Sequence, residues 1–395
     1  MKRLSIIFVV VATIFSLCGC YDSKEIDETA YIIALGIDKN ENPGYNYTFQ
    51  FSAPLATMSS EGSKGGASSE HGENPTVRNI VITAPDFYTA KNMTNNFLSK
   101  TVDMSHLKLI VFSASVGQEG FLNHSQFMLR EREVRPHTAV ALAETTSEEY
   151  LKAVNPELEA NTAKHYELMS LRSNNVYSPI KRLSDFVDEL NSENGSSVLP
   201  VACASGKLKD NIKSDNGQHW VGLKDTEIKS QRAEMRGMGI VRNGQPVGIL
   251  DGDFAMLYNI LKKDIKSCTV TLKNPHYDNL FLTFRLNILH PAEYSVDITK
   301  KPCRILVSQG FDIQFFGGGL PEGFSSFEEL YDYADRVITK KISSYFYEIS
   351  RNQRADIMKI GDRFKSKFLT NENWKSFNWE NTFQAAEFGV NVYFS

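Results

Sequence analysis

One apolar run near the start of this 395-residue chain determines which part of it we expect to fold in water. Lys2 and Arg3 precede an almost wholly apolar stretch from Leu4 to Leu17. A helix that spans a bilayer needs about 20 apolar residues, so this run has the length and charge order of a secretory signal instead. No later run approaches spanning length. We therefore expect the rest of the chain to form a water-soluble body outside the cytoplasm.

The apolar run ends in two cysteines that are one residue apart. Leu17-Cys18-Gly19-Cys20 resembles the lipobox of bacterial lipoproteins, which has a small residue immediately before the cut. This resemblance implies that residues 1–19 are a lipoprotein signal peptide, cut between Gly19 and Cys20, and that Cys20 carries a diacylglyceryl group and an N-acyl chain. Cys18 fits poorly as the acceptor, because bulky Leu17 would precede the cut. A plain signal peptide with incidental cysteines and an uncleaved anchor are the alternatives.

Charge and cysteine content exclude several kinds of protein. The formal net charge is −4, which gives no basic surface for a phosphate backbone, so we expect no nucleic-acid partner. Cys203, Cys268 and Cys303 remain after cleavage, and they lack the spacing of a zinc site or a disulfide scaffold. Cys268 and Cys303 lie in strand-like segments and could pair, but free buried thiols are the expected state.

Strand and helix patterns alternate in the first part of the chain and predict a mixed α/β domain over 20–178. Strands 30–38 and 45–53 flank a turn and form a hairpin. Residues 57–76 contain almost no large apolar side chains and are expected to form a mobile surface loop. Further strands are predicted at 76–83, 106–113 and 137–144, with helices after Pro85, over 120–130 and from Glu148, the last capped by Ser147.

Two further domains are predicted, which makes the whole chain an α+β protein of three mixed α/β domains. Residues 179–234 begin with an amphipathic helix over 179–190 and form a smaller middle domain. Residues 235–395 begin with a hairpin around Asn243-Gly244, the strongest short hairpin signal. Strands follow at 267–272, 280–289 and 303–316, then a long helix over 325–351, a further helix that carries Ile357 to Phe368, and a closing strand. This part predicts an antiparallel sheet packed against long helices.

Motifs for catalysis or cofactor binding are missing from the sequence. It contains no H-E-x-x-H, G-x-S-x-G, Walker A or G-x-G-x-x-G pattern, and its eight histidines are scattered. Asp251 and Asp253 form the best carboxylate pair; they could be a catalytic dyad or a calcium corner, but their place before a helical run favours an N-cap. The glycine-rich segment 315–323 could suggest a phosphate cradle, yet it lacks the following Lys-Ser/Thr, which favours a flexible connector. We expect no enzyme activity, no cofactor and no metal site.

Two other groups of residues have a functional and a plain interpretation. The charge run from Arg130 to Arg135 is either a docking edge or the solvated end of a helix with weak ion pairs. Four aromatic residues near the end of the chain are more typical of a core than of a ligand cage, although exposed rings would suit a protein interface. These residues are Trp374, Phe377, Trp379 and Phe383.

Several segments together resemble one family over nearly the whole chain, the Ger(x)C spore germination lipoproteins. They are "GCYDSKEID…AYIIALGID", "YTFQFSAP", "SHLKLIVFSASVGQEGFLNHSQFMLREREVRPHTAVALAE", "GMGIVRNGQPVGIL" and "NWKSFNWENTFQAAEFGVNVYFS". Tyr21 departs from the family, in which Trp is commoner after the lipid-bearing cysteine. The loop over 57–76 is also longer than expected.

The resemblance implies a non-catalytic C subunit of a nutrient germinant receptor. Such a subunit is lipid-anchored on the outer face of the spore inner membrane, and it works there in receptor assembly and signalling with an A-type membrane subunit and a B-type transporter-like subunit. An extracytoplasmic solute-binding lipoprotein is the alternative, although it normally has two similar lobes. An extracellular hydrolase is the third hypothesis, and it would depend on Asp251 and Asp253.

Overall fold

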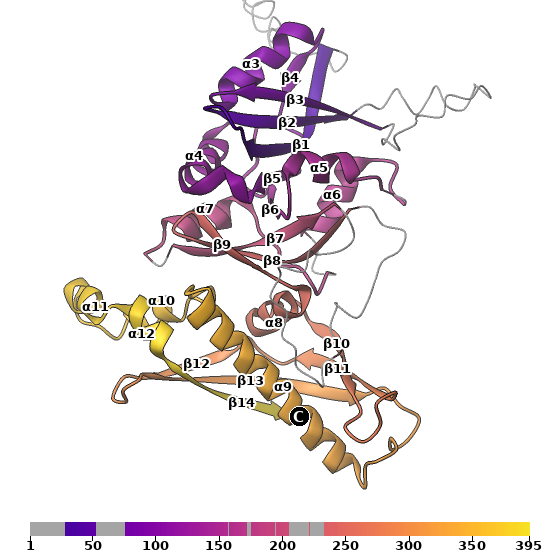
Figure 1. The fold of residues 1–395 in the computed structure, drawn as a ribbon, viewed down its shortest axis with the longest axis vertical. Helices are drawn as coiled ribbons and strands as arrows, with labels where there is room; N and C mark the ends of the chain where they lie inside the picture. Colours follow the sequence, from indigo (N-terminus) through magenta and orange to yellow (C-terminus); the bar gives the residue numbers. More distant parts are fainter. Residues whose placement is uncertain are drawn as a thin grey trace, which may run out of the picture.

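The structure is a computed structural model that describes residues 28–52, 76–156, 158–171, 175–193, 195–204, 221 and 233–395. In these ranges the chain forms two β-sheets with helices packed on them, one sheet from each part of the sequence (Figure 1). The predicted loop over 57–76 falls almost entirely outside the described residues, as do Gly19 and Cys20. The mixed α and β content agrees with the predicted α+β class.

The N-terminal sheet has nine described strands, in the order β3-β2-β1-β5-β6-β7-β8-β9, with β4 beside β1. Strands β1, β5, β6 and β7 are parallel, and antiparallel strands extend the sheet on both sides. The strands are β1 (Thr29–Lys39), β2 (Tyr45–Ser52), β3 (Val77–Ala84), β4 (Thr101–Asp103), β5 (Leu109–Ser113), β6 (Ala139–Ala143), β7 (Ser196–Cys203), β8 (Glu234–Arg242) and β9 (Gln245–Leu250).

Helices cover both faces of this sheet, which explains why its central strands are buried and mostly apolar. One face packs against α3 (Phe87–Phe97), α4 (Gly117–Arg130) and α7 (Leu183–Asn191). The other face packs against α5 (Ser147–Ala153) and α6 (Thr162–Leu171). Every residue of β5, β6 and β7 is buried, as expected for strands with both faces covered. The short 3-10 turn η2 (Ala114–Val116) leads into α4.

The sheet pairings correct the predicted place of the middle segment. Strand β7, from the predicted domain 179–234, pairs with β6, and the hairpin β8–β9, which was assigned to the domain 235–395, pairs with β7. The hairpin itself is confirmed: Asn243 and Gly244 both have positive φ, as its tight turn requires. A hairpin signal is local and does not specify which sheet the hairpin joins, so the sequence placed the change of sheet too early.

The C-terminal unit is an antiparallel sheet crossed by a long helix, as predicted. Helix α9 (Phe327–Tyr347) packs along one face of the sheet (Figure 1), where it buries Leu330, Ile338 and Ile342. The other elements are α8 (Gly252–Lys262), β10 (Ser267–Lys273), β11 (Phe281–Ile288), β12 (Glu293–Asp297), β13 (Arg304–Phe315), the short π-helix η4 (Glu348–Asn352), α10 (Ile360–Lys365), α11 (Asn371–Phe377), α12 (Trp379–Ala385) and β14 (Glu387–Phe394).

The closing strand is the exception to the antiparallel pattern. Strand β14 pairs with β13 in parallel, from Arg304 beside Glu387 to Phe311 beside Phe394. The chain reaches β14 through the helices α9 to α12, and a crossover of this kind produces a parallel neighbour. The sequence could locate this strand but not its direction.

Helix α5 differs from its predicted start by one residue. Thr146 is the N-cap, and its hydroxyl accepts a hydrogen bond from the backbone N of Glu149 at 3.1 Å. The predicted cap, Ser147, instead donates its hydroxyl to Asp38 at the end of β1, and its backbone N donates to the same carboxylate. Adjacent hydroxyl residues make equally good caps, so a contact with another strand decided between them.

Candidate functional site

The two sheets meet at a joint, which we define as the contact of α7, β8 and β9 with α8, η4 and the helices α10 to α12. Helix α8 lies between the sheets (Figure 1), and its residues from Gly252 to Leu261 are all buried. The largest core cluster includes Val198, Met238 and Ile240 of the N-terminal sheet together with the core of the C-terminal sheet. The two units therefore share one hydrophobic core across the joint.

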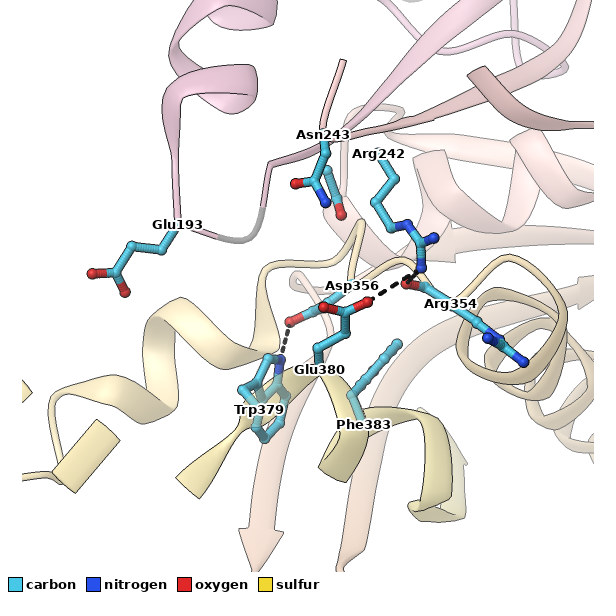
Figure 2. A pocket seen from close by; sticks show the side chains of 9 residues that line it. Glu193, Arg242, Asn243, Arg354, Asp356, Trp379, Glu380 and Phe383 are labelled. Carbon is cyan, nitrogen blue, oxygen red and sulfur yellow. Dashed lines mark hydrogen bonds and ion pairs between the residues drawn. The ribbon is translucent and has the colours of Figure 1, made fainter. Parts of the chain in front are cut away.

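Polar groups surround a cavity of about 110 Å³ at the edge of the joint (Figure 2). Its walls come from the end of α7, the β8–β9 turn, the segment after η4, and α12. The lining residues are Glu193, Ser196, Arg242, Asn243, Arg354, Asp356, Trp379, Glu380 and Phe383. Sites for drug-sized ligands usually measure about 300–1,000 Å³, so this cavity is smaller than such a site.

Arg242, the last residue of β8, reaches across the cavity (Figure 2). Its Nη1 donates to the carbonyl of Arg354 at 3.2 Å and pairs with Oε1 of Glu380 at 3.3 Å. The Glu380 side chain is 57% exposed, so this ion pair contributes little energy. The role that this geometry supports is orientation of the hairpin against α12.

Asp356 is the buried acid of the joint. Its carboxylate accepts hydrogen bonds from the backbone N of Ile360 at 3.0 Å, the backbone N of Gly361 at 2.7 Å and Nε1 of Trp379 at 2.9 Å. Burial raises the pKa of Asp356, although these three donors oppose the shift. A Cβ on Gly361 would lie 2.4 Å from Trp379 Nε1, so the close approach of the indole requires glycine there. The carboxylate therefore fastens α10 to α12.

A buried ion pair lies beside this cluster, in the last turn of α7. Oε2 of Glu189 accepts from Nζ of Lys181 and from the hydroxyl of Ser197, both at 2.5 Å, and Oε1 lies 3.3 Å from Nζ of Lys359. Burial lowers the pKa of Lys181. Burial also raises the pKa of Glu189, but Lys181, Ser197 and Lys359 together outweigh it, and the net shift is downward. The Lys359 contact joins the C-terminal unit to α7.

Glu193 extends the polar contacts of the joint. Its carboxylate lies 2.8 Å from Nζ of Lys365 in α10 and accepts from Nε1 of Trp374 in α11 at 3.1 Å. The carboxylates of Glu189 and Glu193 thus each contact the C-terminal helices. These contacts join the two units at the joint.

A second cavity, of about 170 Å³, lies beside α4 in the N-terminal unit, and it contains a buried histidine. Nε2 of His124 lies 2.7 Å from the hydroxyl of Tyr47, and Nδ1 lies 2.8 Å from the carbonyl of Gly120. Burial lowers the pKa of His124. A neutral ring that donates from Nδ1 and accepts at Nε2 satisfies both contacts. Both nitrogens are therefore engaged within the protein, as in a core histidine.

In the structure, the carboxylate pair Asp251 and Asp253 lies at the start of a helix, as the N-cap interpretation predicted. Asp251 is the N-cap of α8, and its carboxylate accepts from the backbone N of Phe254 at 3.1 Å. Both Asp251 and Asp253 are buried, at 9% and 5% exposure. The predicted N-cap is confirmed. No cluster of His, Cys, Asp or Glu that could hold a metal ion occurs in the described ranges.

The other candidates also have structural roles. Cys203, Cys268 and Cys303 are free and buried, which confirms the expected state of these thiols. Trp374, Trp379 and Phe383 are buried and Phe377 is partly buried in the core, which confirms the prediction of a core over a ligand cage. Residues 316–323 lie in the connection from β13 to α9.

Two acids of the charge run at the end of α4 contact neighbouring elements. Glu131 accepts a hydrogen bond from the hydroxyl of Tyr88, and Glu133 pairs with Lys91 at 2.8 Å and accepts from the backbone N of Met104. These partly exposed contacts match the solvated helix end that the sequence allowed. They fasten α4 to α3.

The sequence analysis missed the acids of the joint. Glu189 follows Phe186 by three residues and precedes Leu190, so it lies on the apolar face of its helix, which was a usable signal of a buried charge. Asp356 gave no such signal, because the partner that identifies its role, Trp379, is 23 residues further along the chain.

Fold and site together define a two-sheet α+β protein whose polar residues join its two units. Comparison with known families matches residues 22–202 to the spore germination protein N-terminal domain and residues 236–395 to the spore germination B3/GerAC-like C-terminal domain. The chain belongs to the Ger(x)C family of spore germination proteins, as the sequence resemblance predicted. The second family domain begins at Arg236, next to the predicted boundary at 235, although β8 and β9 complete the N-terminal sheet.

The chain is also similar to one curated protein and to one solved structure. Spore germination protein B3 of Bacillus subtilis (strain 168) is 22% identical over 267 residues, which cover 64% of this chain and 60% of that protein. The match thus spans about three-fifths of the relative's length. The crystal structure of the GerBC protein is similar with a TM-score of 0.50 at 13% identity, over 91% of this chain and 96% of that one. This likeness concerns the fold alone.

Proposed function

We propose that this chain is the lipid-anchored, non-catalytic C subunit of a spore nutrient germinant receptor. The observation that carries the proposal is the match of both parts of the chain to spore germination domains, behind an N-terminal Leu17-Cys18-Gly19-Cys20 pattern. In this proposal Cys20 bears the lipid, and the folded body contacts A-type and B-type membrane subunits on the outer face of the spore inner membrane. Its contribution is receptor assembly and signalling.

Features of the described residues support a binding role over a catalytic one. The acids with shifted pKa at the joint serve helix capping and contacts between helices and units. No helix in the described part of the chain has the length and apolar character to cross a bilayer. Attachment through acyl chains supplies the membrane contact that the proposal requires, since two chains hold a protein stably.

The lipid anchor is tested by metabolic labelling with radioactive palmitate. Cys20→Ala is expected to abolish the label. Cys18→Ala is the matched control, because Cys18 leaves with the signal peptide and its loss should preserve the label. Label that persists in Cys20→Ala, or that disappears in Cys18→Ala, would contradict attachment at Cys20.

The partners are tested by affinity capture of the acylated protein from spore membranes, followed by mass spectrometry. Co-purification of one A-type and one B-type membrane subunit is the expected result. Capture of the protein alone, together with tight binding of a nutrient by the isolated body in calorimetry, would instead favour a solute-binding lipoprotein.

A further inference from the structure

An apolar surface at the end of α3 is unexplained by the fold. Phe97, in the last turn, is 60% exposed, more than any other aromatic side chain among the described residues. Met93, one turn earlier, is 45% exposed. Residues four apart lie on the same side of a helix, so the two side chains form one patch, which we call the α3 tip. Helix α3 buries Phe87, Ala90 and Thr94 on another side.

The α3 tip lies close to the place where the described chain begins. Thr29, at the start of β1, pairs in parallel with Thr101 of β4. The Oδ1 atom of Asn95 in α3 accepts from the backbone N of Val102 at 3.1 Å, which fastens the end of the helix to β4. Three residues lie between Phe97 and Thr101, so Phe97 lies within about 19 Å of Thr29. Figure 1 shows α3 and β4 together at the end of the molecule opposite the C-terminal sheet.

The proposed anchor joins the folded body at this end of the molecule, because the described chain enters the sheet at Thr29 of β1. Eight residues lie between Cys20 and Thr29, and the chain that joins the two spans at most about 32 Å. Five strand spacings, about 24 Å, separate β1 from β9, and the C-terminal unit lies beyond β9. The α3 tip is therefore an exposed apolar surface within reach of the attachment point.

We infer that Met93 and Phe97 insert into the interfacial layer of the bilayer that holds the Cys20 lipid. The inference rests on the proposed anchor. Aromatic side chains favour the interface between headgroups and acyl chains. Helix α3 contains no Asp or Glu that would repel anionic headgroups, and exposed Lys100 follows it.

The size of the patch favours lipid over a protein partner. Stable protein interfaces bury about 800 Å² on each side, which two side chains cannot supply by themselves. A bilayer contact needs no such area when acyl chains already provide most of the attachment. The α3 tip then adds orientation: it sets which end of the body faces the membrane.

The test places a polarity-sensitive dye at each end of the full-length acylated protein in vesicles of phosphatidylethanolamine and phosphatidylglycerol. Phe97→Cys carries the dye at the α3 tip, and Phe281→Cys is the matched control, because Phe281 is 56% exposed on the C-terminal sheet. The unsubstituted protein controls for labelling of Cys203, Cys268 and Cys303, which are buried. Vesicle flotation is measured on the same samples.

The expected result is that the dye at position 97 shifts its emission to the blue on reconstitution and is quenched by brominated lipid, while the dye at position 281 does neither. Equal exposure to water at both positions in protein that floats with vesicles would overturn the inference and leave the anchor intact. Acylated protein that fails to float would overturn the anchor and the inference together. Protection at position 97 only after partner subunits are added would assign the tip to a protein interface and also overturn the inference.

Discussion

Asp251 caps α8, but burial of its ionised carboxylate costs free energy. Desolvation, together with the neighbouring charge of Asp253, raises the pKa of Asp251 from 3.8 to about 6. A group whose pKa is raised by folding binds protons more tightly in the folded state. Its stabilising contribution is therefore complete below pH 4 and is lost as the pH rises through about 6.

Asp251→Asn should remove this pH dependence while keeping the cap, since Asn caps helices as well as Asp. We expect the variant to gain up to about 3 kcal/mol in unfolding free energy over the natural protein at pH 8, and much less at pH 4. Urea denaturation at both pH values measures the difference. Asp86→Asn, at the exposed cap of α3, is the control; hydrogen bonds from Thr89 lower the pKa of Asp86, so it should gain nothing at pH 8. Equal gains at the two pH values in Asp251→Asn would contradict this account.

The pair of Lys181 and Glu189 provides a second residue-scale prediction. Lys181→Met leaves a carboxylate 7% exposed without its main partner, which should cost about 3–5 kcal/mol of unfolding free energy. The double variant with Glu189→Gln removes the unpaired charge and should recover much of that loss. Denaturation of the two variants checks the coupling. A double variant no more stable than Lys181→Met alone would show that packing, and not charge, sets the cost.

Residue roles were predictable from sequence where their partners are near in the chain. The cap at Asp251 and the turn at Asn243-Gly244 depend on neighbours within three residues. The buried acids depend on distant partners: Glu189 meets Lys359, and Asp356 meets Trp379. Such contacts exist only after the sheets have come together, so local patterns contain little of them.

The turn between β8 and β9 can be tested at the scale of the element. Gly244 has φ of +76°, a conformation that residues with a Cβ adopt at a cost. Gly244→Ala should therefore lower the unfolding free energy by about 1 kcal/mol. Gly318→Ala is the matched control, because that glycine has open space around it and no positive φ. A loss of equal size in both variants, in their urea midpoints, would refute a conformational cause.

Elements were predicted better than their assembly. The strands β10, β11 and β13 and the long helix α9 lie within a few residues of their predicted ranges, because alternating and helical periods are strong there. The assignment of β8 and β9 to the C-terminal sheet was wrong, and the direction of β14 was not anticipated. Which strands pair depends on how the other elements of the fold have assembled, and the sequence of a single segment does not contain this information.

At the scale of the whole molecule, the shared core predicts that the two units unfold together. Met238 in β8 is fully buried in the cluster that continues into the C-terminal unit. Met238→Ala should cost about 2–5 kcal/mol, and it should lower the transition midpoint of both units equally. In a Trp220→Phe background, fluorescence reports only Trp374 and Trp379 of the C-terminal unit, whereas circular dichroism reports all elements. Midpoints that separate in the variant would mean that the units are independent.

Helix α8 has a practical consequence for anyone who wishes to divide the gene. Its residues from Gly252 to Leu261 are all buried, with the N-terminal sheet on one side and α9 on the other. A truncated polypeptide that begins at Asp251 would expose the apolar side of α8 that normally packs on the N-terminal sheet, and we expect it to aggregate. A polypeptide that ends before Glu234 would lack β8, so β7 would become an unpaired edge strand that can pair with another chain.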